Sequence, residues 1–339
     1  MRNLIKIIRK FSQGNILVIG DLILDEFIWG DVERISPEAP VPVVWAKKRS
    51  YMPGGAANVA HNIRSLGGKV SIVGVVGNDA NAHTLISELK KKNIETKNIL
   101  IEQRRHTTLK TRIIAGHQQV VRVDWEHREV IKDSLNERII NFVKSNIRRF
   151  DAIIIEDYGK GLINPVLLSE IIECARQNQK IITVDPKEEH FIYYQAVTCI
   201  TPNRKEAENA IRNIKIKDME NRFKLNFDKL ANRRDIEVAG KEIMQYLNLE
   251  SLLITLGEQG MCLFEKNGRI THIPTVAQEV FDVSGAGDTV IGTFTLALSV
   301  GADKLEAAQI ANFAAGIVVG KIGVAVTNQK ELTQRIRMH

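Results

Sequence analysis

Residues 16–25 read Ile-Leu-Val-Ile-Gly-Asp-Leu-Ile-Leu-Asp, so an apolar run ends in a glycine and an aspartate. Apolar runs of this length, bounded by Gly, Asp or Pro, are typical of strands that are covered on both faces of a sheet. Similar runs follow at 70–76, 152–155, 181–184 and 252–255. Stretches with helical spacing lie between them, at 57–65, 84–92, 165–177 and 290–298. This alternation predicts an α/β protein in three layers, with helices on both faces of a mostly parallel central sheet.

Two stretches depart from this alternation. Residues 40–45, Pro-Val-Pro-Val-Val-Trp, have two prolines in a β-rich run, which suits an edge strand because proline lacks the N–H that a sheet needs. The β-rich residues on either side of Gly116 indicate a hairpin. We expect strands near 31–49 and 106–124 to form a small β-sheet lid outside the main layer. A surface hairpin without a gating role fits the pattern equally well.

Composition limits the choice of function. The chain has 339 residues, of which 44% are hydrophobic and 26% charged, as in ordinary globular proteins. The formal net charge is +7, and residues 209–235 hold eight Lys or Arg but only four Asp or Glu. We interpret this segment as a basic, helical or flexible surface insertion, and we expect no nucleic-acid binding. An anionic substrate fits the remaining positive charge.

The cysteines and the N-terminus indicate the compartment. Cys174, Cys199 and Cys262 are an odd number without tight spacing, so neither a disulfide framework nor a zinc site is expected. Such sparse cysteine is typical of a reducing cytoplasm. Residues 1–10 mix Leu and Ile with Arg and Lys, unlike a signal peptide. No run of about 18 apolar residues predicts a membrane span.

The main chemical signal is the motif Asp-Val-Ser-Gly-Ala-Gly-Asp-Thr at 282–289, in front of the helical stretch at 290–298. Glycines at a helix start let backbone N–H groups approach an anion, and the helix dipole adds positive charge there. A carboxylate would repel a phosphate at this place, so Asp288 suits a base that accepts a proton from an attacking hydroxyl. A helix cap in a tight turn would explain a lone Gly-x-Gly-Asp better, but the companion motifs reverse that preference.

Two further motifs lie near the front of the chain. Gly54 and Gly55 precede a helix of small residues, where a ligand can approach the backbone and Asn58 can bond a sugar hydroxyl. Tight helix–sheet packing is the alternative. Asp21 and Asp25 follow the first strand, at the end where open α/β sheets bind ligands. We favour Asp25 over Asp21 for contact with vicinal hydroxyls, with a helix cap or a solvated turn as the alternative.

Residues 201–207, Thr-Pro-Asn-Arg-Lys-Glu-Ala, have Asn203 and Glu206 three positions apart, on one face of a helical turn. Glu206 can hold Mg²⁺ directly or through water. A capping pair is the alternative, and the spacing alone would favour it.

Basic residues near the expected cleft are candidates for contact with a phosphate: Lys110, Arg112, Arg122 and Lys160. Lys160 lies between two glycines after an Ile-rich strand, where it can reach an anion. The other three lie in the expected lid, where most charges are simply solvated. The eight histidines show no metal-ligand spacing.

Together and in this order, the motifs between Gly20 and Thr289 resemble those of the ribokinase-like, or PfkB, carbohydrate kinases. Asn203 and Glu206 match that family's Asn-x-x-Glu motif for magnesium and ATP, which implies that Arg204 and Lys205 lie at the nucleotide too. One branch is most similar, the D-glycero-β-D-manno-heptose-7-phosphate kinases of ADP-heptose and lipopolysaccharide biosynthesis. The similarity to that branch lies at 34–43, 53–58, His117-Gln118-Gln119, 157–161 and Val283, where many relatives carry Thr.

The resemblance implies one ribokinase-like kinase domain over residues 1–339. It would use MgATP to phosphorylate the anomeric hydroxyl of heptose 7-phosphate to the 1,7-bisphosphate, with Asp288 as the base. The implied contacts are Gly285, Ala286 and Gly287 with the transferred phosphoryl group, Asp25, Gly54, Gly55 and Asn58 with the sugar, and Lys110, Arg112, Arg122 and Lys160 with its 7-phosphate.

Further expectations follow from the same resemblance. It implies a homodimer through the lid strands, a stand-alone kinase, and in some relatives a monovalent cation beside Asp282. Residues 209–235 are longer than is usual for the branch. Two other functions stay open, a ribokinase-like kinase for another sugar, sugar phosphate or nucleoside, and a non-catalytic sugar or nucleotide sensor on the same fold. A nucleic-acid-binding protein would rest on the isoelectric point alone.

Overall fold

The computed structural model describes residues 2–116, 118–277 and 279–339, so His117 of the quoted resemblance lies outside the described residues. Within these ranges, nine strands form the main sheet in the order β13-β12-β11-β10-β9-β8-β1-β4-β5. Neighbours are parallel from β11 to β5, while the pairs β11–β12 and β12–β13 are antiparallel. The strands are β1 (Asn15–Gly20), β4 (Lys69–Gly77), β5 (Ile99–Glu102), β8 (Ala152–Glu156), β9 (Ile181–Asp185), β10 (Cys199–Ile200), β11 (Ser251–Thr255), β12 (Met261–Glu265) and β13 (Ile270–Ile273). The predicted mostly parallel sheet is confirmed.

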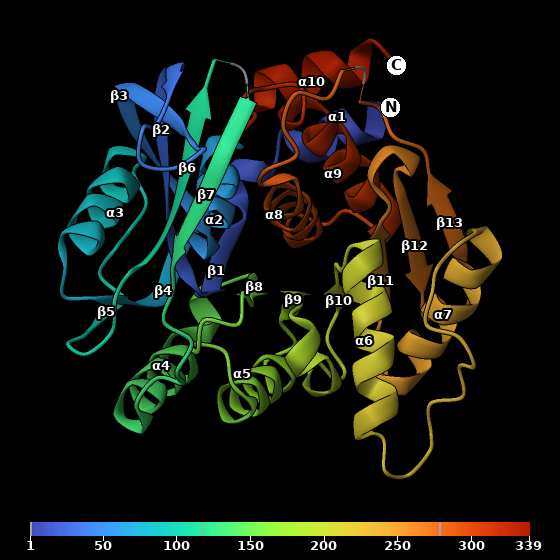
Figure 1. Cartoon of the computed structure of the whole chain (residues 1–339). Coiled ribbons are helices and arrows are strands. Elements are labelled where there is room, and N and C mark those ends of the chain that lie inside the picture. The colour runs from blue at the N-terminus through green and yellow to red at the C-terminus, as the bar shows by residue number, and fades with distance from the viewer. Residues whose placement is uncertain (1, 117, 278) are drawn as a thin grey trace.

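Helices cover both faces of this sheet, as Figure 1 shows. Alternate residues of β1 explain why, since Leu17 and Ile19 belong to one buried core and Ile16 and Val18 to the other. The first core packs against α4 (Asp133–Asn146), α5 (Pro165–Gln177), α6 (Arg204–Lys217) and α7 (Arg233–Tyr246). The second packs against α1 (Arg2–Ile8), α2 (Ala56–Ser65), α3 (Ala80–Lys91), α8 (Ala286–Ser299), α9 (Lys304–Val318) and α10 (Gln329–Arg337). No helix in the described ranges is long and apolar enough to cross a membrane.

Local chemistry sets several helix starts. α5 begins at Pro165 because a proline tolerates the first helical position, and the Asn164 side chain accepts the N–H of Leu167 at 3.0 Å. The predicted range 165–177 matches this helix. The start of α8 differs, because Gly285 occupies the capping position and no side chain caps the helix. That end of α8 therefore has backbone N–H groups available for a ligand.

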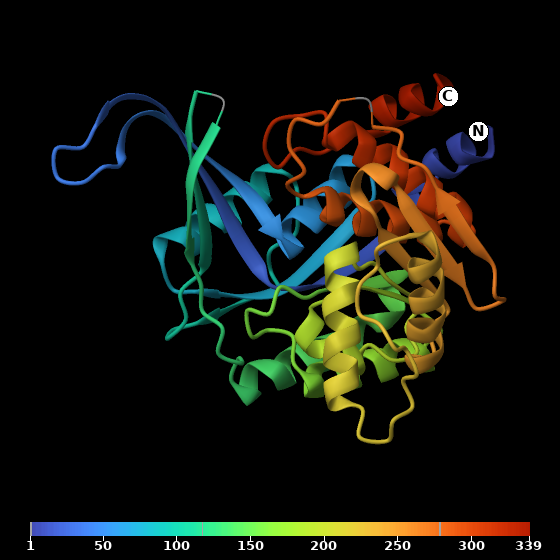
Figure 2. The same cartoon turned by 45° about the vertical axis from the view of Figure 1, so that its right-hand side comes forward.

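A second, four-stranded sheet lies outside the main layer, in the order β3-β2-β6-β7. Its strands are β2 (Leu22–Ile35), β3 (Pro42–Gly55), β6 (Thr108–Ala115) and β7 (Gln118–Trp125). Figure 2 shows the β2–β3 hairpin projecting from the body next to β6 and β7. The predicted small sheet and the edge position of β3 are confirmed. β2 begins nine residues before the predicted boundary at 31 and β3 continues six residues past 49, so both strands run from the hairpin tip into the interior.

The basic segment at 209–235 contributes to the core as well as to the surface. It continues α6, crosses an irregular stretch and enters α7. Its charged side chains are mainly exposed, and so are Ile216 and Met219, but five of its apolar side chains are buried in the core: Ile211, Ile214, Phe223, Leu225 and Leu230. These buried residues make the segment part of the helical layer. The polar composition did not reveal them, because they are few and are spaced for burial on one side.

Candidate active site

The predicted base, Asp288, lies in the first turn of α8 and is buried. Gly285 precedes the helix with φ 76°, a left-handed conformation that favours glycine, and a Cβ there would lie 2.7 Å from Asn58 Nδ2. Asn58 donates to Asp288 Oδ2 at 2.6 Å, and the Tyr158 hydroxyl donates to Asp288 Oδ1 at 2.9 Å. The glycine thus lets α2 approach α8 closely enough for Asn58 to hold the base.

The surroundings of Asp288 tune its acidity. Burial raises the pKa of Asp288 to about 6, the hydrogen bonds from Asn58 and Tyr158 oppose the rise, and the charge of Asp25 adds to it. A general base works best when its pKa lies close to the working pH. Asp288 is therefore a better proton acceptor than an exposed aspartate and is still ionised at neutral pH.

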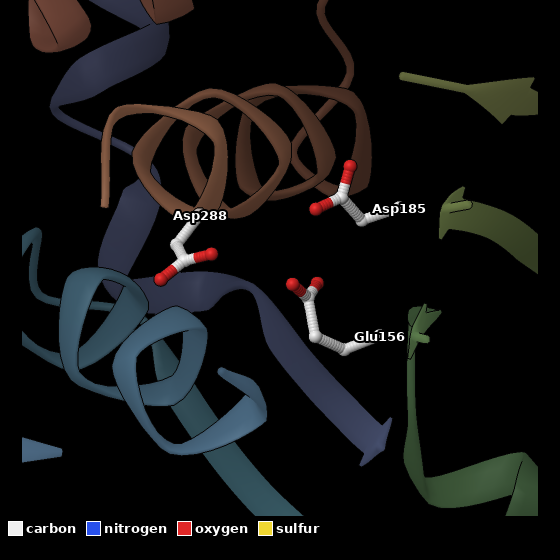
Figure 3. Close-up of side chains that lie close together, drawn as sticks. All are labelled: Glu156, Asp185 and Asp288. Atoms are coloured by element: carbon white, nitrogen blue, oxygen red, sulfur yellow. The ribbon is translucent and has the colours of Figure 1, made fainter. Parts of the chain in front are cut away.

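Two acids that the sequence reasoning missed, Glu156 and Asp185, face Asp288. They end β8 and β9 and are directly opposite each other in the parallel register. One carboxylate oxygen from each of the three acids lies within 4.8 Å of the others. Figure 3 shows the three groups turned toward one another beside the start of α8. We call these three residues the acidic cluster.

The acidic cluster fits a divalent cation. Glu156 is fully buried, and neither of its carboxylate oxygens has a hydrogen-bond partner among the described residues. Burial, followed by the charges of Asp185 and Asp288, raises the pKa of Glu156 well above its usual value. Burial, followed by the charges of Glu206 and Asp288, does the same to the pKa of Asp185. Buried carboxylate oxygens at this spacing are the hard ligands that Mg²⁺ prefers, and the ion would compensate their charge.

The predicted sugar contacts meet on the other side of Asp288. Asp25 of β2 lies beside Gly54 of β3, where a Cβ would be 2.2 Å from Asp25 Oδ2. Gly55, with φ 55°, then turns the chain into α2, which carries Asn58. Glycine at both positions allows a carboxylate and an amide to lie side by side next to the base. The Asp25 carboxylate is paired with the Arg112 guanidinium.

Asp21 has a different environment. Its carboxylate accepts the backbone N–H groups of Tyr158 at 2.9 Å, Lys160 at 3.0 Å and Leu162 at 3.3 Å. Burial raises the pKa of Asp21 to about 6, and these three bonds oppose the rise. Asp21 therefore positions the loop that carries Tyr158 and Lys160, in agreement with the preference for Asp25 as the ligand contact.

Asn203 and Glu206 form a capping box at the start of α6. Asn203 Oδ1 accepts the Glu206 N–H at 2.9 Å, and Glu206 Oε2 accepts the Asn203 N–H at 2.8 Å. The capping alternative therefore holds, but it does not exclude a second role, because the charge of Glu206 reaches both Glu156 and Asp185. Arg204 donates to Gln259, and Lys205 is exposed.

The four predicted cations are already paired with carboxylates. Lys110 and Lys160 converge on Glu126, at 3.8 and 2.7 Å. Arg112 pairs with Asp25, whereas Arg122 pairs with Asp124 at 3.0 Å and is half exposed. Lys110 also lies over the Tyr158 ring, 5.8 Å from its centre. The structure thus brings Lys110 and Lys160 together near the base, and Arg122 is the most solvated of the set.

A cavity of about 570 Å³ adjoins Ala286 and Gly287 at the start of α8. Its wall is mostly apolar and includes Val283, Met261 and Val319. Pockets of this size and character commonly bind small molecules. Sequence reasoning did not find the cavity because segments far apart in the chain build its wall.

Known proteins share much of this sequence. The chain is 42% identical over 318 residues to the "Bifunctional protein HldE" of Geobacter sulfurreducens, with 94% of this chain and 62% of that protein covered. It is 44% identical over 321 residues to the protein of the same name from Aliarcobacter butzleri, with 95% and 64% covered. The chain therefore spans less than two thirds of the length of these relatives.

The fold has solved counterparts. A structure of Arabidopsis thaliana ribokinase complexed with ribose and ATP superposes with a TM-score of 0.73 at 17% identity, over 96% of this chain and 99% of that one. The architecture is therefore ribokinase-like. The sequence model described as "pfkB family carbohydrate kinase" matches residues 13–331. With that match over nearly all of its length, and with a buried aspartate at the glycine-rich start of α8, the chain belongs to the pfkB family of carbohydrate kinases.

Proposed function

We propose that the chain is an ATP-dependent kinase that phosphorylates the anomeric hydroxyl of D-glycero-β-D-manno-heptose 7-phosphate to the 1,7-bisphosphate, for ADP-heptose synthesis. Kinase activity is supported above all by the position of Asp288, which is buried at the glycine-rich start of α8 and accepts hydrogen bonds from Asn58 and Tyr158. The heptose phosphate is supported by the resemblance at residues 34–43 and Val283, and by Lys110 and Lys160 near the base.

In this proposal, one set of residues orients the sugar and another binds the phosphoryl group that is transferred from ATP. Asp25, Gly54 and Asn58 orient the sugar so that its anomeric hydroxyl points at Asp288, which accepts the proton as the oxygen attacks the γ-phosphorus. The N–H groups at the start of α8, from Gly285, Ala286 and Gly287, hold the charge of the transferred phosphoryl group. Such donors are often worth about 3 kcal/mol in the transition state. The Ala286 N–H donates to the Val283 carbonyl at 3.2 Å, a long bond that a phosphoryl oxygen can replace.

Nucleotide and metal occupy the neighbouring space in this proposal. The cavity beside Gly287 takes the adenine and ribose of ATP, with Asn203, Arg204 and Lys205 near the phosphates. Glu156 and Asp185, together with Glu206 through water, would hold Mg²⁺, which neutralises phosphate charge when bound. The resemblance also allows a monovalent cation beside Asp282, whose carboxylate already accepts the N–H groups of Ser284 and Gly323.

A kinase assay tests the proposal. Heptose 7-phosphate, fructose 6-phosphate, ribose and a nucleoside are each incubated with MgATP, in potassium and in sodium buffer, and the product is identified by mass and NMR. We expect the 1,7-bisphosphate to form with by far the highest kcat/KM. Faster turnover of another acceptor would move the protein to a different branch of the family. Tight binding of sugar or nucleotide without any ADP formation would favour the sensor.

As part of the same proposal, two copies pair through their lid strands. The lid exposes large apolar side chains, with Trp45 and Trp125 65% and 64% exposed. Single exposed apolar residues are ordinary, but two tryptophans on one small sheet indicate a contact surface. Sedimentation should give a dimer that Trp45→Glu dissociates, whereas Val166→Glu, at an exposed apolar position on α5, should leave it intact. A monomeric wild type would refute the pairing.

The three described cysteines are free and buried. Free thiols and the use of ATP both suit the cytoplasm, which we propose as the location.

A further inference from the structure

Glu126 is the one acid that contacts two of the predicted phosphate ligands within the part of the chain that the structure describes. It follows β7 directly, and its side chain is 11% exposed. Its Oε2 lies 2.7 Å from Lys160 Nζ and 2.9 Å from Arg128 Nη2, and its Oε1 lies 3.8 Å from Lys110 Nζ. The two lysines come from separate elements, β6 and the loop after β8. Glu126 therefore joins the lid to the body of the molecule.

The lysines are largely buried around this carboxylate. Lys110 and Lys160 have side-chain exposures of 16% and 11%, whereas Arg128 is 74% exposed. Burial lowers the pKa of Lys110, Asp124 opposes the change, and the charge of Lys160 adds to it. Two buried ammonium groups that repel each other need opposite charge nearby, and Glu126 contacts both of them, while Asp124 adds a further negative charge near Lys110.

The cations around Glu126 stabilise its charged form. Burial would raise the pKa of Glu126, but hydrogen bonds from Lys160 and Arg128, together with the charge of Lys110, outweigh burial and lower it. Asp124 and Arg122 pair with each other at the rim, and Arg112 is occupied by Asp25. A carboxylate at Glu126 thus occupies the position in which an anion would meet both lysines.

We propose that Glu126 is a specificity-determining counter-ion, which holds Lys110 and Lys160 together in the empty enzyme and is displaced by the phosphate already present on the sugar. This inference rests on the proposed function, because it takes the two lysines as the site of that phosphate. A phosphate anchored by a sugar that also contacts Asp25 and Asn58 gains enough to displace the carboxylate. Free inorganic phosphate has no such anchor, so Glu126 keeps it out.

The arrangement also couples the phosphate to the base. Lys110 covers the ring of Tyr158, and the hydroxyl of Tyr158 donates to Asp288. A phosphate that takes Lys110 from Glu126 therefore binds one side chain away from the reacting hydroxyl. The counter-ion determines which anions remain there long enough to react.

Glu126→Gln tests the idea, because glutamine keeps the size and removes the charge. Glu129→Gln is the matched control, since Glu129 is on the same segment, its side chain is 87% exposed and its carboxylate lies 3.5 Å from His127 Nε2. Calorimetry with inorganic phosphate, and steady-state kinetics with heptose 7-phosphate, are measured for both variants and for wild type. Thermal unfolding confirms that each variant is folded. If Glu126→Gln is unfolded, Glu126→Asp serves instead, because the shorter side chain keeps the charge but loosens the contact with Lys160.

We expect Glu126→Gln to bind inorganic phosphate about tenfold more tightly than wild type and to show a KM for the sugar phosphate lowered severalfold, with kcat unchanged or reduced by slower product release. Glu126→Asp should show smaller changes of the same sign in phosphate affinity and KM. Glu129→Gln should match wild type in both. Unchanged phosphate binding, or a raised KM for the sugar phosphate, would overturn the counter-ion and make Glu126 a scaffold for Lys160. If heptose 7-phosphate is not turned over but phosphate still binds more tightly to Glu126→Gln, the proposed substrate fails and the counter-ion stands.

Discussion

The end of the main sheet and the lid hold charge in opposite ways. At the sheet end, Glu156, Asp185 and Asp288 have no basic partner at contact distance among the residues that the structure describes, and burial raises their pKa values. In and beside the lid, each candidate cation already has a carboxylate, as Lys160 of the loop after β8 has Glu126 and Arg112 of β6 has Asp25. The sheet end is therefore buried and short of positive charge, whereas the cations of the lid are neutralised and must exchange partners to bind an anion. In the proposed function, the catalytic step takes place in the first region and the second selects the substrate.

The largest effect should come from the base. Asp288→Ala removes the proton acceptor, and general base catalysis contributes about 10²–10⁴-fold to a rate, so kcat should fall at least about 10³-fold while sugar binding persists. Asp303→Asn is the control, because Asp303 also begins a helix but serves only as its cap. Stopped-time ADP assays and calorimetry measure the two quantities. Retained turnover in Asp288→Ala would remove the chemistry from the sheet end.

The next effect concerns the metal ligands. Asp185→Asn should lower kcat about 100-fold and raise the Mg²⁺ concentration needed for half-maximal rate, because it removes a charged ligand. In EDTA the same variant should melt at a higher temperature than wild type, since a buried, repelled carboxylate is gone. Asp151→Asn, which changes an exposed acid before β8, should do neither. Equal magnesium dependence in Asp185→Asn and wild type would count against the acidic cluster as a metal site.

A smaller effect should appear in the pH profile. Tyr158 donates to the ionised form of Asp288, so Tyr158→Phe should raise the pKa of Asp288 further above about 6. The acidic limb of the kcat/KM profile then moves to higher pH. The kcat/KM of Tyr158→Phe falls below that of wild type mainly at and below this limb, and the difference shrinks at higher pH. Tyr194→Phe removes a similar hydroxyl from Asp157, bonded at 2.6 Å, and should leave the limb in place. A limb that does not move in Tyr158→Phe would mean that the tyrosine does not tune the base.

The smallest effect should come from the cations in and beside the lid. Lys160→Ala should raise KM for the sugar phosphate about tenfold with little change in kcat, because a charged hydrogen bond is worth about 1.5–3 kcal/mol. Arg122→Ala should cost less, since Arg122 is half exposed and paired with Asp124. Lys47→Ala, at an exposed lid lysine, is the control. If kcat of Lys160→Ala fell by a larger factor than its KM rose, that lysine would act in the catalytic step.

Sequence reasoning was strongest where the signal is local. The apolar run at 16–19 and the helix at 165–177 follow from side-chain period and capping, which neighbouring residues decide. Asp288 followed from glycines at a helix start, and the structure adds a reason, because Gly285 makes room for Asn58. For the basic segment at 209–235, composition did not reveal the apolar residues that are buried in the core, because it averages them with the charges.

By itself, the sequence determined the alternation of strands and helices, the small lid sheet and the glycine loop that ends in Asp288, since each depends on residues close together in the chain. Only the tertiary structure decided that Glu156 and Asp185 meet Asp288, because the pairing of β8 with β9 and the position of α8 over them are set by packing between distant segments. The same holds for Glu126, a charged residue after a lid strand, which acquires a role because β6 and the loop after β8 bring two lysines to it. Charge balance in a buried site is a property of the assembled fold, and no stretch of sequence contains it.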